Sequence, residues 1–129
     1  MARPNVALTP REIAEMEWTP IAGSSDSFEK ILSRDPVTGS HTRLLKALPG
    51  NTIDQVLVHD FWEETYILEG GWWEDDTFQG AGTYTCLPPG TPHGPYRTET
   101  GYLCLENRYY LETAGSPRKM PERARSTQG

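Results

Sequence analysis

Short apolar runs, each closed by glycine or proline, fill the chain from Ser27 onward. The runs are rich in β-branched and aromatic residues and keep no helical period, which favours strands over helices. The expected strands cover residues 27–33, 42–48, 53–58, 59–69, 83–87 and 102–111, with a further hairpin of Trp72 and Trp73 against Phe78. Short strands separated by frequent turns are typical of an antiparallel sandwich or barrel, so we expect an all-β fold.

Turn residues set the limits of these strands. Residues 34–39 combine a proline, which fixes φ, with a glycine, which supplies a left-handed conformation. We therefore expect residues 28–48 to form a hairpin. The Gly70-Gly71 pair is expected to end the strand that begins at His59, and Asp75-Asp76 is expected to form the turn of the tryptophan hairpin.

A helix is expected only near the N-terminus. Thr9 suits an N-cap and Glu12 completes a capping box with it, while Pro10 fits the first helical position. This predicts a short external helix that runs through Met16. The chain then divides into an N-terminal segment with the helix (1–17), a single β-barrel domain (18–112) and a flexible C-terminal tail (113–129). The tail is polar, basic and contains proline, which is typical of loosely packed ends.

Length, charge and hydropathy restrict the possible partners. The chain has 129 residues, enough for one domain with a core, and its net charge of −6 argues against a nucleic-acid surface. No run approaches the roughly 18 apolar residues of a membrane span, and the N-terminus lacks the apolar core of a signal peptide. We therefore expect a cytoplasmic protein whose partner is a small molecule, not a nucleic acid or a membrane. Cys86 and Cys104 show no CxxC spacing, and each is expected to pack as a small buried residue.

Two histidines and one carboxylate are candidate metal ligands. His59 and Glu63 are four residues apart, which places both side chains on the same face of a strand. His93 follows the turn at residues 88–90 and could bring a second imidazole to that face. Two histidines and a carboxylate, with positions left open for water or substrate, are the ligands of non-haem Fe(II) oxygenases and resemble those of catalytic zinc. The set also suits Mn, Ni or Co.

The two stretches that carry these residues resemble the paired motifs of the cupin superfamily, which consists of small jelly-roll β-barrels. In the first motif, His59 takes the place of the second histidine, Glu63 that of the glutamate, and Gly70 stands at the required spacing. The second motif is matched at Gly82, Pro88, Gly90 and His93. Within cupins, the sequence is most similar to the ChrR-like group, which includes acetylacetone-dioxygenase-like proteins. The resemblance covers roughly residues 18–111.

The first motif departs from the cupin pattern at one ligand. Leu57 stands where the first histidine of His-x-His is expected, so the chain offers at most three of the usual four ligands. Asp54 and Gln55 are nearby but weak candidates for a fourth donor. His41 is the only other histidine, and its place beside a turn predicts a solvent-exposed side chain. Three ligands still suffice for a catalytic site, which needs open coordination.

Other side chains are candidates for substrate contact. The best of them are Tyr96 and Arg97, just after His93. Trp62 is a further candidate, although most of the aromatic rings are expected to pack in the core or between subunits. A guanidinium near a metal ion could clamp a carboxylate or enolate oxygen, and a surface position beside Glu99 is the alternative for Arg97. Glu106 and Arg108 share one face of the last strand, where they either line the cavity or lie outside it.

The cupin resemblance implies a metal-dependent enzyme that acts on a small oxygenated organic substrate, such as a diketone, hydroxyketone or organic acid. It favours oxygenative C–C cleavage that depends on one divalent metal ion. Fe(II) is the favoured metal, and Zn, Ni, Mn or Co are the alternatives. A non-oxidative lyase or isomerase reaction at the same site is one alternative. A barrel that senses metal or a small ligand without turnover is another, and a metal-free barrel marked by Leu57 is a third. The resemblance also implies a homodimer, which would hide strand edges.

Overall fold

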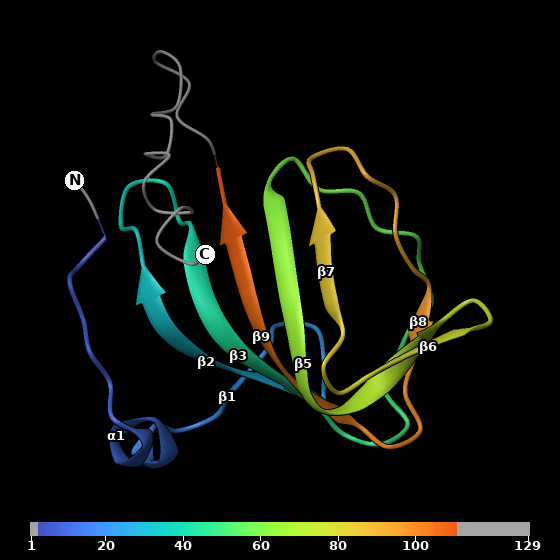
Figure 1. Cartoon of the computed structure of the whole chain (residues 1–129), viewed down its shortest axis with the longest axis horizontal. Helices are drawn as coiled ribbons and strands as arrows, with labels where there is room; N and C mark the ends of the chain where they lie inside the picture. The colour runs from blue at the N-terminus through green and yellow to red at the C-terminus, as the bar shows by residue number, and fades with distance from the viewer. Residues whose placement is uncertain (1–2, 111–129) are drawn as a thin grey trace, which may run out of the picture.

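A curled antiparallel sheet forms half of a barrel, with one short helix beside it (Figure 1). The structure is a computed structural model that describes residues 3–110. Its elements are α1 (Pro10–Glu15), β1 (Thr19–Pro20), β2 (Ser27–Arg34), β3 (His41–Ala47), β4 (Thr52–Ile53), β5 (Trp62–Glu74), β6 (Thr77–Gly80), β7 (Tyr84–Leu87), β8 (Tyr96–Arg97) and β9 (Tyr102–Tyr109). Hydrogen-bonded neighbours follow the order β1-β2-β3-β9-β5-β8-β4, and β6 and β7 also pair with β5. The predicted all-β fold with an N-terminal helix is confirmed.

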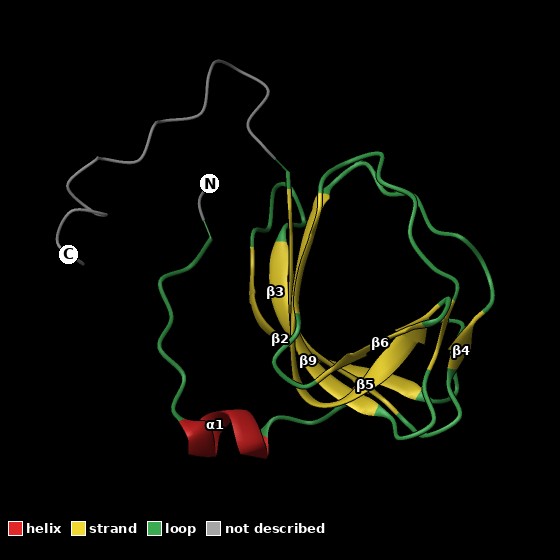
Figure 2. Ribbon diagram, turned by 45° about the vertical axis from the view of Figure 1, so that its right-hand side comes forward, coloured by secondary structure: helices red, strands yellow, loops and turns green. Residues whose placement is uncertain are grey.

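The N-terminal segment contacts the sheet at β2 and β3 and lies to one side of it (Figure 2). The predicted capping box is present in α1, where Thr9 Oγ1 accepts from the Glu12 amide at 3.1 Å. Trp18 lies under two ammonium groups, those of Lys30 and Lys46, at 4.7 and 4.8 Å from its ring centroid. No helix among residues 3–110 is long and apolar enough to cross a membrane. The predicted flexible tail falls outside the described residues.

The longest strand, β5, belongs to both parts of the curled sheet. Its first half pairs with β7 and β9, and its second half, from Gly71, pairs with β6 and β8. The predicted end of this strand at Gly70-Gly71 is therefore wrong, because the pair marks a change of partners. Gly70 has a φ of +66°, and a Cβ there would lie 2.1 Å from the carbonyl oxygen of Gly101. Only glycine, which has no Cβ, permits that close approach. Strand β5 can therefore continue through Gly70 from the first part of the sheet into the second.

The stretch before β5 also differs from the prediction. Strands were expected over residues 53–58 and from His59 onward, yet only Thr52–Ile53 (β4) pairs regularly there, and residues 54–61 form a loop. Its one bridge joins Leu57 to His93. The facing segment, residues 88–95, contains four prolines, which lack the amide donor that a continuous ladder requires. Pairing is consequently limited to the single bridge.

Side chains on the inner face of the sheet change from apolar to charged along the strands. Three rows follow one another across neighbouring strands: Leu45, Cys104 and Ile67; then Arg43, Glu106 and Thr65; then Arg108 and Glu63. Ile67 and Cys104 are fully buried and form the core with Trp72. The prediction of a buried cysteine is right for Cys104 and wrong for Cys86, which is exposed on β7. The charged rows leave one end of the inner face suited to a polar site.

The corner of β5 can be tested with two alanine variants. Gly70 and Gly82 both have positive φ, but a Cβ at Gly82 would meet nothing within 4 Å. Gly82→Ala should therefore cost only the left-handed strain, about 1–2 kcal/mol. Gly70→Ala adds a clash with backbone and should lower the free energy of unfolding by about 3 kcal/mol or more. Urea denaturation measures both, and equal losses would contradict the close approach to Gly101.

Candidate metal centre

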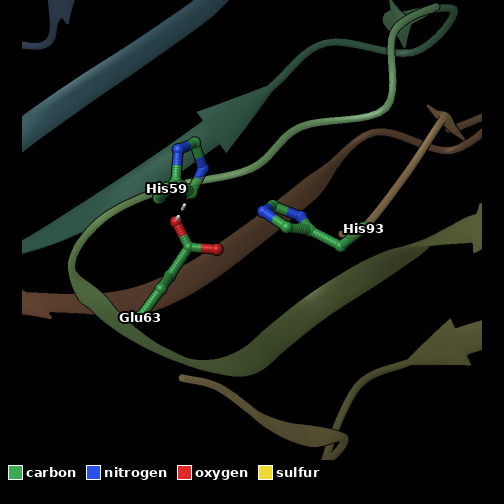
Figure 3. A group of neighbouring side chains, drawn as sticks. All are labelled: His59, Glu63 and His93. Atoms are coloured by element: carbon green, nitrogen blue, oxygen red, sulfur yellow. Dashed lines mark ion pairs between the residues drawn. The ribbon is translucent and has the colours of Figure 1, made fainter. Parts of the chain in front are cut away.

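Three side chains from separate parts of the chain point toward one another at the charged end of the inner face (Figure 3). Glu63 is the second residue of β5, His59 lies in the loop that precedes this strand, and His93 lies between β7 and β8. One ligand atom from each residue lies within 4.8 Å of the others. His59 Nε2 lies 3.9 Å from Glu63 Oε1. The three side chains converge as expected, but the expected reason is wrong for His59, which lies in a loop and not on a strand face shared with Glu63.

Backbone hydrogen bonds hold the two histidine loops together. The Leu57 amide donates to the His93 carbonyl at 2.7 Å, and the His93 amide donates to the Leu57 carbonyl at 3.0 Å. The Gly90 amide also donates to the His59 carbonyl at 2.8 Å. Since each loop is pinned to the other beside its histidine, the two imidazoles are placed by main-chain pairing rather than by a shared strand.

Neighbouring aromatic rings orient the imidazoles. The Tyr96 hydroxyl forms a 2.8 Å hydrogen bond with Nδ1 of His93, which leaves Nε2 of that ring for a ligand. Phe61 stacks on His59, with ring centroids 4.5 Å apart and an interplanar angle of 11°. Nε2 of His59 is buried and has no hydrogen-bond partner among residues 3–110. A buried, unpaired imidazole nitrogen beside a carboxylate and a second imidazole fits a divalent transition metal ion.

The protonation states of the imidazoles also suit a metal ion. Burial, and then the positive charge of Arg108, lowers the pKa of His59 below its ordinary value. Burial, and then the neighbouring His59, lowers the pKa of His93. Both rings are therefore neutral at pH 7, the form in which imidazole binds metals.

The pKa of Glu63 is shifted upward, whereas the pKa of a carboxyl in an ordinary ion pair is shifted downward. Burial, and then the negative charge of Glu106, raises the pKa of Glu63 to about 7, although Arg108 and Arg43 oppose the shift. A carboxylate that is costly to ionise in the fold would gain from a cation placed beside it. The electrostatics of Glu63 therefore favour a metal ion as its partner.

The cluster forms part of the wall of a cavity of about 570 Å³. Apolar and aromatic side chains line one part of the cavity, including Leu57, Trp72, Tyr102 and Leu87. Charged side chains of β3 and β9 line another part, namely Arg43, Glu106 and Arg108. Small-molecule sites commonly have this volume and this mixture of apolar walls with a few polar groups.

A chain of ion pairs runs from the sheet interior to the cluster. Glu106 Oε1 lies 2.7 Å from Arg43 Nη2 and 2.7 Å from Arg108 Nε, and Arg43 Nη1 reaches Glu29 at 2.6 Å. Arg108 Nη2 then lies 3.3 Å from Glu63 Oε1. Sequence reasoning left Glu106 and Arg108 undecided between inside and outside, and they lie inside. It missed Arg43, although an arginine at an inward-facing position of the predicted strand 42–48 was a usable signal.

The predicted substrate residues are not gathered in one place. Tyr96 lines the cavity, whereas Arg97 and Trp62 are not among its lining residues. Arg97 is exposed, with its guanidinium carbon 5.1 Å from the Trp73 ring centroid. Trp62 stacks on Tyr109, with the two ring centroids 6.1 Å apart. Substrate contact by Arg97 and Trp62 stays a prediction.

The weaker ligand candidates are placed as follows. Asp54 and Gln55 line the cavity, but Asp54 is not part of the cluster of possible ligands. His41 was expected to be exposed and is instead half-buried at the start of β3, with Nδ1 2.9 Å from the Gly39 carbonyl. Leu57 is one of the residues that line the cavity, so an apolar residue stands where the cupin pattern has a fourth ligand.

A comparison with known protein families shows the family to which the chain belongs. A family model described as the ChrR Cupin-like domain matches residues 9–112, which is most of the sequence. The chain belongs to the ChrR cupin-like family. The cupin resemblance of the two sequence motifs is thereby confirmed. No curated protein sequence matches this cupin significantly.

Solved structures share the fold of this cupin at low sequence identity. An RmlC-like cupin from Shewanella frigidimarina superposes with a TM-score of 0.62 at 18% identity, over 84% of this chain and 93% of that one. An acetylacetone dioxygenase from Acinetobacter johnsonii gives 0.61 at 14%, over 99% and 91%. ChrR from Rhodobacter sphaeroides, an anti-sigma protein in complex with SigE, gives 0.59 at 20%, over 75% and 50%. These likenesses establish the fold alone.

Glu63→Gln should change the pH dependence of stability in the metal-free protein. The pKa of Glu63 is about 7 in the fold against an ordinary value of 4.5, so its stabilising contribution is present below pH 4.5 and lost as pH rises through 7. Glutamine does not titrate. The melting temperature of the parent minus that of Glu63→Gln should therefore fall between pH 4.5 and 7 and stay level above pH 8. A difference that is constant over the whole range would refute the assigned shift.

Leu57→His should restore a fourth ligand. Leu57 lines the cavity, and its backbone is paired with His93, so an imidazole there can reach the cluster. We expect Leu57→His to bind Zn(II) more tightly than the parent in competition with a chromogenic chelator. Val58→His is the matched control, because Val58 is 59% exposed. Equal affinities for the two histidine variants would show that position 57 does not face the metal.

Proposed function

We propose that the protein is a metal-dependent enzyme that cleaves a C–C bond of a small oxygenated organic substrate with dioxygen. The observation that carries the proposal is the open set of three ligands, His59, Glu63 and His93, in the wall of the 570 Å³ cavity. Three donors leave coordination positions for substrate. The fold shared with an acetylacetone dioxygenase supports the reaction class as an analogy.

Each part of the cavity has a distinct role in this proposal. A metal ion held by the three side chains would supply Lewis acidity and, as the favoured Fe(II), electrons for dioxygen; Zn, Ni, Mn and Co also suit the ligands. Tyr96 keeps His93 in one orientation through the bond to Nδ1. Leu57 and Trp72 provide apolar walls that exclude water from the reacting atoms. Both atoms of dioxygen would enter the products, one on each carbon of the broken bond.

Two other functions use the same site. A lyase or isomerase would use the metal ion as a Lewis acid and would convert substrate without consuming oxygen. A non-catalytic sensor is supported by a specific observation, the fold shared with ChrR in complex with SigE. A sensor would bind metal or ligand without turnover.

A homodimer, expected from the cupin resemblance, stays a proposal. It is supported by exposed apolar side chains on the outer face of the sheet. Tyr66 is 46% exposed on β5 and is paired directly with Tyr84 on one side and Leu105 on the other, which are 56% and 36% exposed. Contiguous apolar surface of this kind marks interaction sites in soluble proteins.

Metal content tests the proposed function first. The purified protein, incubated with Fe(II) under argon and desalted, should retain about one equivalent of metal by elemental analysis. His59→Ala and His93→Ala should each retain less than about a tenth of that amount, because removal of one of three ligands leaves two. His41→Ala, which removes a histidine outside the cluster, should retain as much as the parent.

Oxygen uptake then separates the reaction classes. The Fe(II)-loaded parent should consume dioxygen in proportion to an added β-diketone, and the two histidine variants should not. Conversion of the diketone without oxygen uptake would instead support the lyase or isomerase. Metal retention with no conversion of any diketone, hydroxyketone or keto acid would support the sensor. A parent that retains no metal after incubation with Fe(II), Zn(II), Ni(II), Mn(II) or Co(II) would refute both metal-dependent enzymes and a metal sensor, and only a sensor of a small ligand would be left.

A further inference from the structure

Arg108 lies directly beside the ligand cluster. It projects from β9 into the cavity, and its Nη2 is 3.3 Å from Glu63 Oε1. Its guanidinium carbon lies 5.0 Å from the ring centroid of Phe61, which in turn stacks on His59. A cation–π contact of this kind holds a guanidinium in place without using its hydrogen-bond donors. Arg108 is thus fixed within reach of any molecule that contacts the cluster.

The donors of Arg108 are largely unused. A guanidinium has five N–H donors, and the one hydrogen bond that Arg108 donates among residues 3–110 is the 2.7 Å bond from Nε to Glu106. The contact with Glu63 is a longer ion pair. Glu106 holds the Nε edge and Glu63 faces Nη2 at 3.3 Å, so the remaining N–H donors of the two terminal nitrogens are available to another acceptor.

Arg43, the other arginine of the cavity wall, differs in this respect. Its Nε donates to Glu106 at 2.8 Å, its Nη2 lies 2.7 Å from the same oxygen, and its Nη1 reaches Glu29 at 2.6 Å. The Arg43 side chain is 9% exposed, whereas that of Arg108 is 29% exposed. Arg43 therefore neutralises the buried Glu106 and the half-buried Glu29, and Arg108 is the guanidinium available to a ligand.

We propose that Arg108 forms an anion-binding subsite next to the metal centre and that the substrate carries a carboxylate. The inference rests on the proposed function and deepens it, because it selects organic acids over neutral diketones and hydroxyketones. The carboxylate is held by the terminal nitrogens of Arg108 while other oxygens of the same molecule face His59, Glu63 and His93. A cavity of about 570 Å³ has room for both groups.

The structure favours Arg108 over Arg97 for this role. The sequence made Arg97 a candidate carboxylate clamp because it follows His93 closely, with a surface position beside Glu99 as the alternative. Arg97 is exposed, donates to the Asp75 carbonyl at 3.3 Å, and is not among the residues that line the cavity. The two arginines are thus alternatives that one experiment can separate.

The test compares 2,4-dioxopentanoate with its methyl ester, two ligands that differ by one negative charge and one methyl group. Both offer the same diketone oxygens, and only the acid carries a carboxylate. Binding is measured by calorimetry to the Zn(II)-loaded protein, since zinc has no redox chemistry and turnover with dioxygen is avoided. The proteins are the parent, Arg108→Met, Arg108→Lys and Arg97→Met, with folding checked by circular dichroism and zinc content by elemental analysis.

We expect the parent to bind the acid about tenfold more tightly than the ester, the size of one hydrogen bond to a charged group. Arg108→Met should bind the two ligands about equally, while its affinity for the ester stays near that of the parent. Arg108→Lys keeps the charge but loses the two-pronged geometry, so its preference should fall below the parent's. If Arg108→Met does not fold, the preference of Arg108→Lys decides the question. Arg97→Met should keep the preference of the parent.

Three results would overturn the inference. Equal binding of acid and ester by the zinc-loaded parent would show that the cavity has no anion subsite, although the metal centre would stand. If Arg108→Met still bound the acid more tightly than the ester and Arg97→Met did not, the anion subsite would belong to Arg97. A parent that retains neither zinc here nor Fe(II) in the earlier metal analysis would refute the proposed function, and the inference would fall with it.

Discussion

A buried carboxylate, that of Glu106, connects the interior of the sheet to the candidate site. One of its oxygens lies within 2.8 Å of three nitrogens, two from Arg43 and one from Arg108. Buried charges are tolerated only when each is paired and hydrogen-bonded, so the position of one charge fixes that of the next. Strands β3 and β9 supply these charges at directly paired positions, Arg43 and Glu106. Among the described residues, these ion pairs allow the charges of Arg43 and Glu106 to lie beside the apolar core of Ile67 and Cys104.

The candidate site combines that rigid wall with two loops. Glu63 comes from β5, the most extensively paired strand, whereas His59 and His93 come from segments with almost no regular pairing. The loops are held by a few main-chain bonds beside the histidines. Such an arrangement places one ligand on a scaffold and two on segments that can vary in sequence, which is where functional residues of β proteins usually lie.

The sequence predicted what depends on local chemistry. The capping box of α1 involves residues three apart, and the β2–β3 hairpin follows from the turn at residues 34–39. The meeting of His59, Glu63 and His93 was predicted from motif spacing, and their metal binding stays a prediction. Contacts between distant residues were missed. Arg43 pairs with Glu106, 63 positions away, and nothing near Arg43 in the chain indicates that partner. The passage of β5 through Gly70 likewise depends on Gly101, which only the folded sheet brings close.

The number of charges in the ion-pair chain has a consequence for the order of binding. Three carboxylates, Glu29, Glu106 and Glu63, face two guanidiniums, Arg43 and Arg108, so the ionised row carries an excess negative charge. A divalent cation at Glu63 would reverse that excess. An anion that arrives before the cation is repelled by the row, and one that arrives afterwards is attracted to it. When Glu63 is ionised, the charges of the row therefore favour binding of the metal ion before binding of the acid.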